Sequence, residues 1–196
     1  MPELPEVETI KRELLTQLIG IKIIKVIILR PEIIGYPEPE QFVKILRQTE
    51  IEDIVRKAKY LIFKLSNQQQ LIFHLRLSGS LIITDRSSKP RYSRIKFFLS
   101  NNRILHFTEP RLLGRVYLIR ENCRPEVLKG FFTLGREPIA RNFDLDYLQN
   151  IIANRKACIK SLLLDQRIAA GVGNIYSDEA LFQAGIRPTR RASTLS

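Results

Sequence analysis

The first twenty residues repeat their apolar side chains every three or four positions. Val7, Ile10, Leu14 and Leu18 mark this period, and Gly20 follows them. A repeat near 3.6 residues is typical of an amphipathic helix, and glycine is common just past a helix end. The pattern therefore predicts an N-terminal helix that packs one face on a core.

Between residues 22 and 120 the pattern changes to short runs rich in β-branched and aromatic residues. Pairs and clusters of turn-forming residues separate these runs, for example Ser78-Gly79 and Asn101-Asn102. Strands of this length and spacing predict an antiparallel β-sandwich or barrel. The expected strands cover residues 23–29, 51–55, 60–65, 70–77, 81–84, 95–99, 103–107 and 116–119.

The last third of the chain returns to helical periodicity after a basic, loop-like stretch. Helices are expected at residues 147–155, capped by Asp144 or Asp146, at 157–170, closed by Gly171, and at 174–184, closed by Gly185. We therefore expect an α+β protein, with a helix and β-sandwich in residues 1–133 and an incomplete all-helical domain in residues 134–196.

Charge narrows the choice of partner. The 196 residues hold 32 Lys and Arg against 20 Asp and Glu, a net charge of +12, which favours a polyanion such as nucleic acid or an acidic membrane surface. No apolar run approaches the roughly 18 residues that cross a bilayer, and no signal peptide is evident, so a cytoplasmic location is expected. The cysteines and histidines of the chain indicate neither a disulfide framework nor a complete zinc site. They are Cys123, Cys158, His74 and His106.

The N-terminus carries a candidate nucleophile. Removal of Met1 would expose the secondary amine of Pro2 beside the carboxyl groups of Glu3 and Glu6. An α-amino group titrates near pH 7.7–8.0, so an unprotonated fraction can attack a carbon that bears a leaving group. Taken alone, the same residues also fit the ordinary start of a helix, with a proline and acids in its first turn.

Three further segments allow a chemical or a structural interpretation. Lys59 precedes an apolar strand and is either a functional amine or a solvated strand end. The turn at Ser78-Gly79 either aims Leu77 outward or leaves it in the core of a hairpin. Arg111, in a loop between strands, is either a phosphate or groove contact or an ordinary surface residue.

A fourth segment has two glycines between predicted helices, in the stretch Ala170-Gly171-Val172-Gly173-Asn174. Such a loop lets the backbone approach a phosphate at the following helix terminus. It matches neither a Rossmann fingerprint nor a P-loop, and it also fits a helix-turn-helix corner without a ligand.

Together, and in this order, these segments resemble the formamidopyrimidine-DNA glycosylase family along essentially the whole chain. Leu4 stands where the related endonuclease VIII branch usually has glycine, which favours the branch that acts on oxidised purines. The matching segments are Met1-Pro2-Glu3-Leu4-Pro5-Glu6-Val7-Glu8-Thr9, Ala58-Lys59-Tyr60-Leu61, His74-Leu75-Arg76-Leu77-Ser78-Gly79-Ser80, Glu109-Pro110-Arg111 and Gly171-Val172-Gly173-Asn174-Ile175-Tyr176.

The resemblance implies a bifunctional DNA glycosylase and AP lyase with a β-sandwich, a helix-two-turns-helix domain and DNA in the cleft between them. Pro2 would attack C1′ of the damaged nucleotide, Glu3 would act as general acid on the sugar ring, and Lys59 would contact the adjacent phosphate and assist proton transfer. The partner would be double-stranded DNA with oxidised purines or abasic sites, bound by a monomeric bacterial protein associated with the nucleoid.

Further residues match positions that hold DNA in the family. Leu77, Arg111 and Leu113 would fill the gap left by the flipped nucleotide. The remaining expected DNA contacts are His74, Tyr92, Arg155, Lys160 and Asn174.

The chain also departs from the family pattern. Leu77 stands where the family often has Met, Leu113 where it usually has Phe, and Tyr92 where His is common. The chain ends at Ser196, before the C-terminal zinc finger that holds the family's one zinc ion, so we expect a fragment with no metal ligand or cofactor within residues 1–196.

Two other functions fit part of these observations. A lesion-binding or abasic-site-binding module of the same fold, weak or silent in catalysis, would keep the DNA contacts without turnover. A ribosomal or RNA-structural protein would account for the charge alone.

Overall fold

The computed structural model describes residues 2–195, which form two compact units, Met1–Lys129 and Gly130–Ser196. Each unit has its own apolar core. The predicted removal of Met1 lies outside the described residues.

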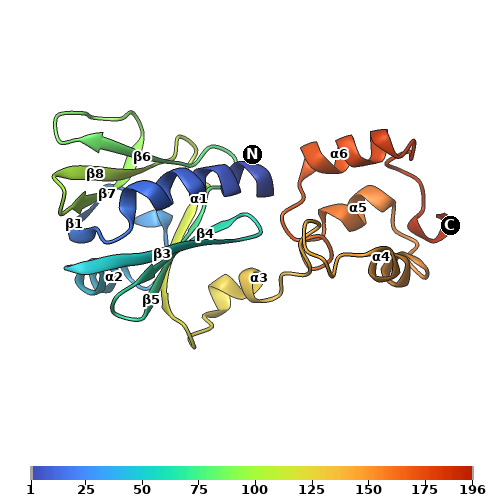
Figure 1. The fold of residues 1–196 in the computed structure, drawn as a ribbon, viewed down its shortest axis with the longest axis horizontal. Coiled ribbons are helices and arrows are strands. Elements are labelled where there is room, and N and C mark those ends of the chain that lie inside the picture. Colours follow the sequence, from blue (N-terminus) through green and yellow to red (C-terminus); the bar gives the residue numbers. More distant parts are fainter. Residues whose placement is uncertain (1, 196) are drawn as a thin grey trace. The chain divides into compact units, whose positions relative to one another are not determined.

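The predicted N-terminal helix is present as α1 (Leu4–Leu18). Glu3 is its N-cap, and the backbone N–H of Glu3 donates to the Glu6 carboxylate at 2.8 Å. Gly20 follows the helix with φ +76°, a conformation that glycine adopts without strain. The buried face of α1 packs on strands β3 (Thr49–Lys57) and β4 (Tyr60–Leu65), as Figure 1 shows.

Nine strands form one sheet in the order β2-β9-β5-β4-β3-β1-β7-β8-β6. Neighbouring strands are antiparallel except β2 and β9, which pair in parallel, a pairing that the purely antiparallel expectation missed. The other strands are β1 (Lys22–Ile28), β2 (Ile34–Tyr36), β5 (Gln69–His74), β6 (Ser80–Asp85), β7 (Ser93–Leu99), β8 (Arg103–Thr108) and β9 (Arg115–Arg120).

Two details of the sheet region correct the predictions. The strand expected at 70–77 ends at His74, because the chain turns there and Arg76 takes φ +55°. Residues 31–46, for which no element was predicted, form a short 3₁₀ helix (Pro31–Ile33), β2 and helix α2 (Pro39–Leu46). Proline is favoured in a first helical turn, so Pro39 begins α2 rather than preventing it.

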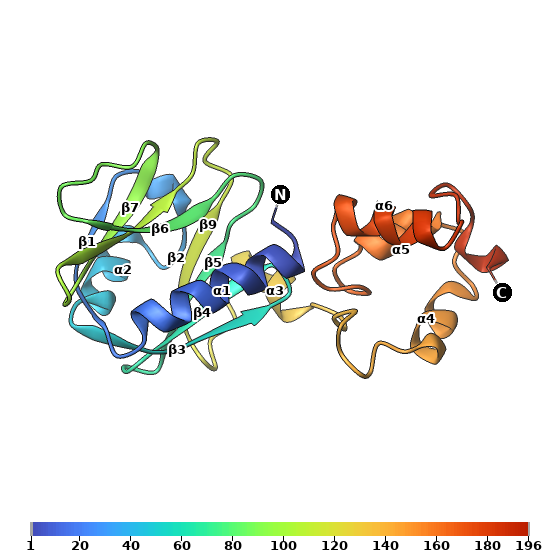
Figure 2. The same cartoon turned by 45° about the horizontal axis from the view of Figure 1, so that its top comes forward.

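Phe73 lies at the centre of the first core. Its ring is 5.1 Å from Phe63 on β4, 5.9 Å from Phe97 on β7 and 5.7 Å from Phe107 on β8, measured between centroids. Strands from both ends of the sheet order therefore cover one core, as a sheet folded onto itself requires, and Figure 2 shows this curvature. The predicted fold class is confirmed.

The second unit is helical, with α4 (Leu145–Ile152), α5 (Ile159–Leu164) and α6 (Asn174–Gln183) around a smaller core. Before it come a 3₁₀ helix (Glu126–Leu128) and α3 (Lys129–Phe132), and a further 3₁₀ helix covers Ala192–Thr194. Asp144 caps α4 by accepting the Tyr147 N–H, as predicted.

The helix predicted at 157–170 is wrong in length, since α5 ends at Leu164. Asp165 leaves the helical conformation, and its carboxylate accepts the backbone N–H and the guanidinium of Arg167. Ile168, Ala169 and Ala170 are buried by a turn instead, so their apolar pattern resembles a helix without forming one.

We expect Phe73→Ala to destabilise the first unit by about 3–5 kcal/mol, because it leaves a cavity among three aromatic rings. Phe98→Ala is the matched control, since Phe98 is only half-buried on β7 and should cost less. Urea denaturation followed by circular dichroism measures both, and equal losses would contradict the position given to Phe73.

Candidate active site

The start of α1 places a buried acid directly after Pro2. Glu3 is 1% exposed, whereas Pro2 is half-buried. Glu3 is fixed here because it caps the helix, so its backbone is extended while the next residues are helical. A carboxyl group at this position can exchange a proton with a substrate bonded to the Pro2 nitrogen.

Glu8 joins α1 to the turn that carries Lys59. The Arg56 guanidinium donates to the Glu8 carboxylate at 3.0 Å and to the Ala58 carbonyl at 3.1 Å. Burial alone would raise the pKa of Glu8, but hydrogen bonds from Lys11, Arg56 and Arg12 lower it to about 2. Glu8 is therefore ionised at neutral pH and keeps its hydrogen bond to Arg56.

Lys59 occupies a two-residue turn between β3 and β4, next to Ala58, which has φ +52°. Only 6% of Lys59 is exposed, which rules out a solvated strand end. Burial lowers the pKa of its ammonium group, and the nearby Glu3 carboxylate partly offsets this effect. Glu3 and Lys59 thus interact electrostatically inside the first unit.

His74, the last residue of β5, lies beside this pair. Its Nδ1 accepts the backbone N–H of Arg76 at 3.1 Å, and its ring meets Tyr60 edge-on at 4.4 Å. Burial lowers the pKa of His74 to about 3, with further contributions from the positive charges of Arg76 and Lys59. His74 is therefore neutral at pH 7, and its Nδ1 lone pair accepts the hydrogen bond from Arg76 in the turn.

Leu77 projects from the loop that follows His74. It is 46% exposed, so the alternative with Leu77 in the core is wrong. The loop is tight: the Gly79 N–H donates to the Leu75 carbonyl at 2.9 Å, and a Cβ added at Gly79 would lie 2.5 Å from that oxygen. Glycine is required because a larger residue would push the loop open.

A second loop, between β8 and β9, presents Arg111 and Leu113. Arg111 is exposed, Leu113 is 44% exposed, and Leu112 between them packs on the core with φ +57°. Tyr92, in the loop before β7, is 40% exposed and lies 4.6 Å from the Arg91 guanidinium. These loops carry exposed apolar side chains next to cations, as a surface that enters DNA needs.

Three expected DNA contacts belong to the second unit. Arg155 and Asn174 are exposed, and Asn174 is the first residue of α6. The Lys160 ammonium is half-buried and forms an ion pair with Asp178 at 2.7 Å. A phosphate that binds Lys160 would therefore compete with Asp178.

Gln166 is a residue that the sequence interpretation missed. Its side-chain oxygen accepts the Gly171 N–H at 2.9 Å, and its amide nitrogen donates to the carbonyls of Leu164 and Val172. It thereby fixes the glycine loop before α6, where Gly171 has φ +94°. No local pattern indicates this role, since Gln166 lies inside a predicted helix.

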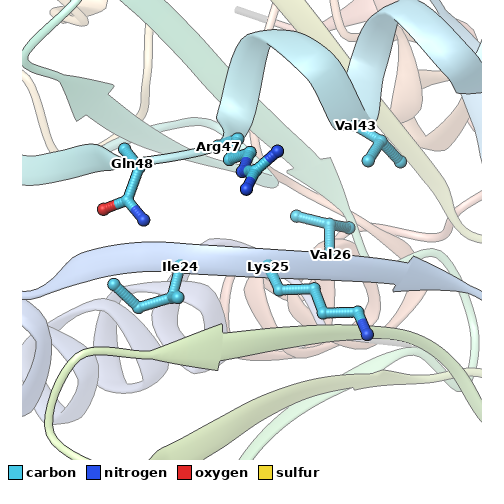
Figure 3. A pocket seen from close by; sticks show the side chains of 6 residues that line it. All are labelled: Ile24, Lys25, Val26, Val43, Arg47 and Gln48. Atoms are coloured by element: carbon cyan, nitrogen blue, oxygen red, sulfur yellow. The ribbon is translucent and has the colours of Figure 1, made fainter.

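Other features of the described residues add no site. Within residues 2–195 no group of three or more His, Cys, Asp or Glu could hold a metal ion. No described helix is long and apolar enough to cross a membrane. A groove of about 450 Å³ lies between β1 and α2. In Figure 3, Val26 points toward α2 and Lys25 points to the other side of the strand. No predicted site residue lines the groove.

Comparison with known families agrees with this arrangement. Residues 1–116 match the formamidopyrimidine-DNA glycosylase N-terminal domain, and residues 134–196 match the H2TH domain of the same family. The chain belongs to the formamidopyrimidine-DNA glycosylase family.

Curated relatives and solved structures of this family cover the whole chain. The formamidopyrimidine-DNA glycosylase of Moorella thermoacetica is 43% identical over 100% of this chain and 72% of its own length, and that of Prochlorococcus marinus is 39% identical over 100% and 73%. The Lactococcus lactis enzyme, solved with DNA containing an abasic site, has a TM-score of 0.91 at 32% identity and covers 99% of this chain and 72% of its own. A variant of that enzyme bound to DNA containing Fapy-dG also gives 0.91.

His74 should make stability depend on pH in the acid range. Its folded pKa, about 3, lies below the ordinary 6.5, so its contribution is complete above pH 6.5 and is lost as the pH falls toward 3. Between pH 7 and pH 4.5 we expect the wild type to lose about 2 kcal/mol more than His74→Asn, which keeps an acceptor but does not titrate. Denaturation at both pH values measures this, and equal losses would contradict a neutral His74.

Proposed function

We propose that this protein is a DNA glycosylase that removes oxidised purines and, as an AP lyase, cleaves the strand at the resulting abasic site. The observation that carries the proposal is the burial of Glu3 and Lys59 in the unit that contains Pro2. Its support is membership of a family whose solved member binds DNA with an abasic site or Fapy-dG.

In the first step, the Pro2 nitrogen, freed by removal of Met1, attacks C1′ of the damaged nucleotide. As the new bond forms, the Pro2 nitrogen gives its own proton to the Glu3 carboxylate. The C1′–N bond to the base breaks, and the base leaves with its electron pair and takes up a proton from water. Glu3 then gives a proton to the ring oxygen O4′ as the C1′–O4′ bond opens, which leaves an iminium cation between Pro2 and C1′. Glu3 directly follows Pro2, and its capping position fixes its backbone at the start of α1.

In the second step, the iminium acidifies the proton on C2′. Loss of that proton forms a carbon–carbon double bond and expels the 3′ phosphate, and water later releases the sugar from Pro2. Lys59 holds the neighbouring phosphate and assists proton transfer. Its lowered pKa suits both roles, because burial makes the ammonium a better acid and the free amine accessible at lower pH.

The exposed loops would hold the DNA once the damaged nucleotide leaves the stack. Flipping a nucleotide costs a few kcal/mol, and an apolar wedge with a cation can fill the gap. We assign Leu77, Arg111 and Leu113 to this gap and Tyr92 to the backbone. Arg155, Lys160 and Asn174 of the second unit would add phosphate contacts, so binding should weaken with salt.

Borohydride trapping tests the proposal. The full-length protein without Met1, mixed with a duplex containing 8-oxoguanine opposite cytosine, should form a covalent adduct as hydride reduces the iminium. Absence of an adduct would contradict the proposal. Tight binding to an abasic analogue without turnover, unchanged by Pro2→Gly, would instead favour a silent lesion-binding module.

We expect Glu3→Gln to slow base removal by about 10²–10⁴-fold, because the amide can neither take the proton from the attacking Pro2 nitrogen nor pass it to the sugar. Glu13→Gln is the matched control, since Glu13 is exposed on α1 and should leave the rate unchanged. Single-turnover rates on the lesion duplex measure both variants. A Glu3→Gln rate within threefold of the wild type would remove Glu3 from the mechanism.

A further inference from the structure

Glu109 is a buried carboxylate to which the proposed mechanism gives no role. It follows β8 directly and is 0% exposed. Its Oε1 accepts the Ser78 hydroxyl and the Arg111 backbone N–H, the latter at 2.9 Å, and its Oε2 accepts the Gly114 N–H at 3.0 Å. Both oxygens are therefore occupied by donors.

These donors come from two separate loops. Ser78 belongs to the loop between β5 and β6, next to the exposed Leu77. Arg111 and Gly114 bracket the exposed Leu113 in the loop between β8 and β9. The Glu109 carboxylate thus links the two loops by hydrogen bonds. These loops carry the exposed side chains of Leu77, Arg111 and Leu113.

The backbone of Glu109 extends the link to a third segment. Its N–H donates to the Tyr92 carbonyl at 3.0 Å, and its own carbonyl accepts the Arg94 guanidinium at 2.7 Å. Gly114 permits the close approach, because a Cβ there would lie 2.9 Å from the Glu109 Oε2. The loops before β7, after β5 and after β8 all converge on this residue.

We propose that Glu109 is a positioning residue that makes the two loops insert into DNA as one rigid wedge. The inference rests on the proposed function, since it concerns how that function opens the duplex. Separate surface loops would move independently and would lose conformational entropy on insertion. Hydrogen bonds to a charged group are about twice as strong as neutral ones. The bonds to Glu109 therefore hold Leu77, Arg111 and Leu113 in fixed relative positions before DNA binds.

The donor pattern makes Glu109→Gln a sharp test. Two of the three partners are backbone N–H groups, one on each oxygen, and an N–H cannot accept a hydrogen bond. A glutamine amide must therefore turn its NH₂ toward one of them and lose that bond at unchanged side-chain size. Such a variant keeps the fold's shape and loosens one loop.

Two substrates separate positioning from chemistry. On a duplex with 8-oxoguanine opposite cytosine, where a wedge is needed, Glu109→Gln should slow single-turnover trapping by 10-fold or more. On a single-stranded oligonucleotide with a preformed abasic site, where no base pair must open, it should stay within threefold of the wild type. Exposed Glu121→Gln is the control and should match the wild type on both substrates.

The outcomes separate the two proposals. Equal rates for Glu109→Gln and wild type on the duplex, or equal losses on both substrates, would overturn the positioning role and leave the glycosylase intact. A wild type that traps neither substrate would overturn the proposed function and this inference with it. Should thermal unfolding show that Glu109→Gln does not fold, Ser78→Ala decides. A loss confined to the duplex supports the link, and unchanged rates on both substrates overturn it.

Discussion

The structure depends on taking two opposite charges, Glu3 and Lys59, out of water at one place in the first unit. A buried charge without a partner costs several kcal/mol, and the Glu3 carboxylate offsets part of this cost for the Lys59 ammonium. The start of α1 fixes one of them and the turn between β3 and β4 fixes the other. Arg56 joins these elements by contacting Glu8 and the Ala58 carbonyl.

The burial of Glu3 and Lys59 requires α1 to pack on the sheet, because each element supplies one of the two groups. Lys59 lies in the turn between β3 and β4, the two strands on which α1 packs, and its burial lowers its pKa. His74 remains neutral next to Lys59, so it adds no further positive charge at neutral pH. The result is a buried acid and a buried amine in the same unit as Pro2.

Much of the fold could be predicted from residue patterns because most strands are short runs of β-branched and aromatic residues, with turn-forming residues between them. The exceptions have physical reasons. Three prolines between residues 31 and 39 concealed β2 and α2, although Pro39 sits where a helix accepts proline. Ile168 and its neighbours have the composition of a helix but are buried in a turn that Asp165 and Gln166 stabilise.

The candidate site was less predictable than the fold. Motifs made Pro2, Glu3 and Lys59 candidates, but the burial of Lys59 follows from tertiary packing and not from its neighbours in sequence. The exposure of Leu77 depends on a tight turn at Gly79, which the Ser-Gly pair indicated. The links made by Glu109 and Gln166 join residues that are distant in the chain or lie across a turn, so no local pattern could reveal them.

The interaction between Glu3 and Lys59 is measured most directly by an NMR titration of the Lys59 ammonium in the wild type and in Glu3→Gln. Burial should hold the pKa of Lys59 below 10.5 in the wild type, and removal of the Glu3 charge should lower it further. An ordinary pKa in the wild type, or the same value in both proteins, would contradict the account.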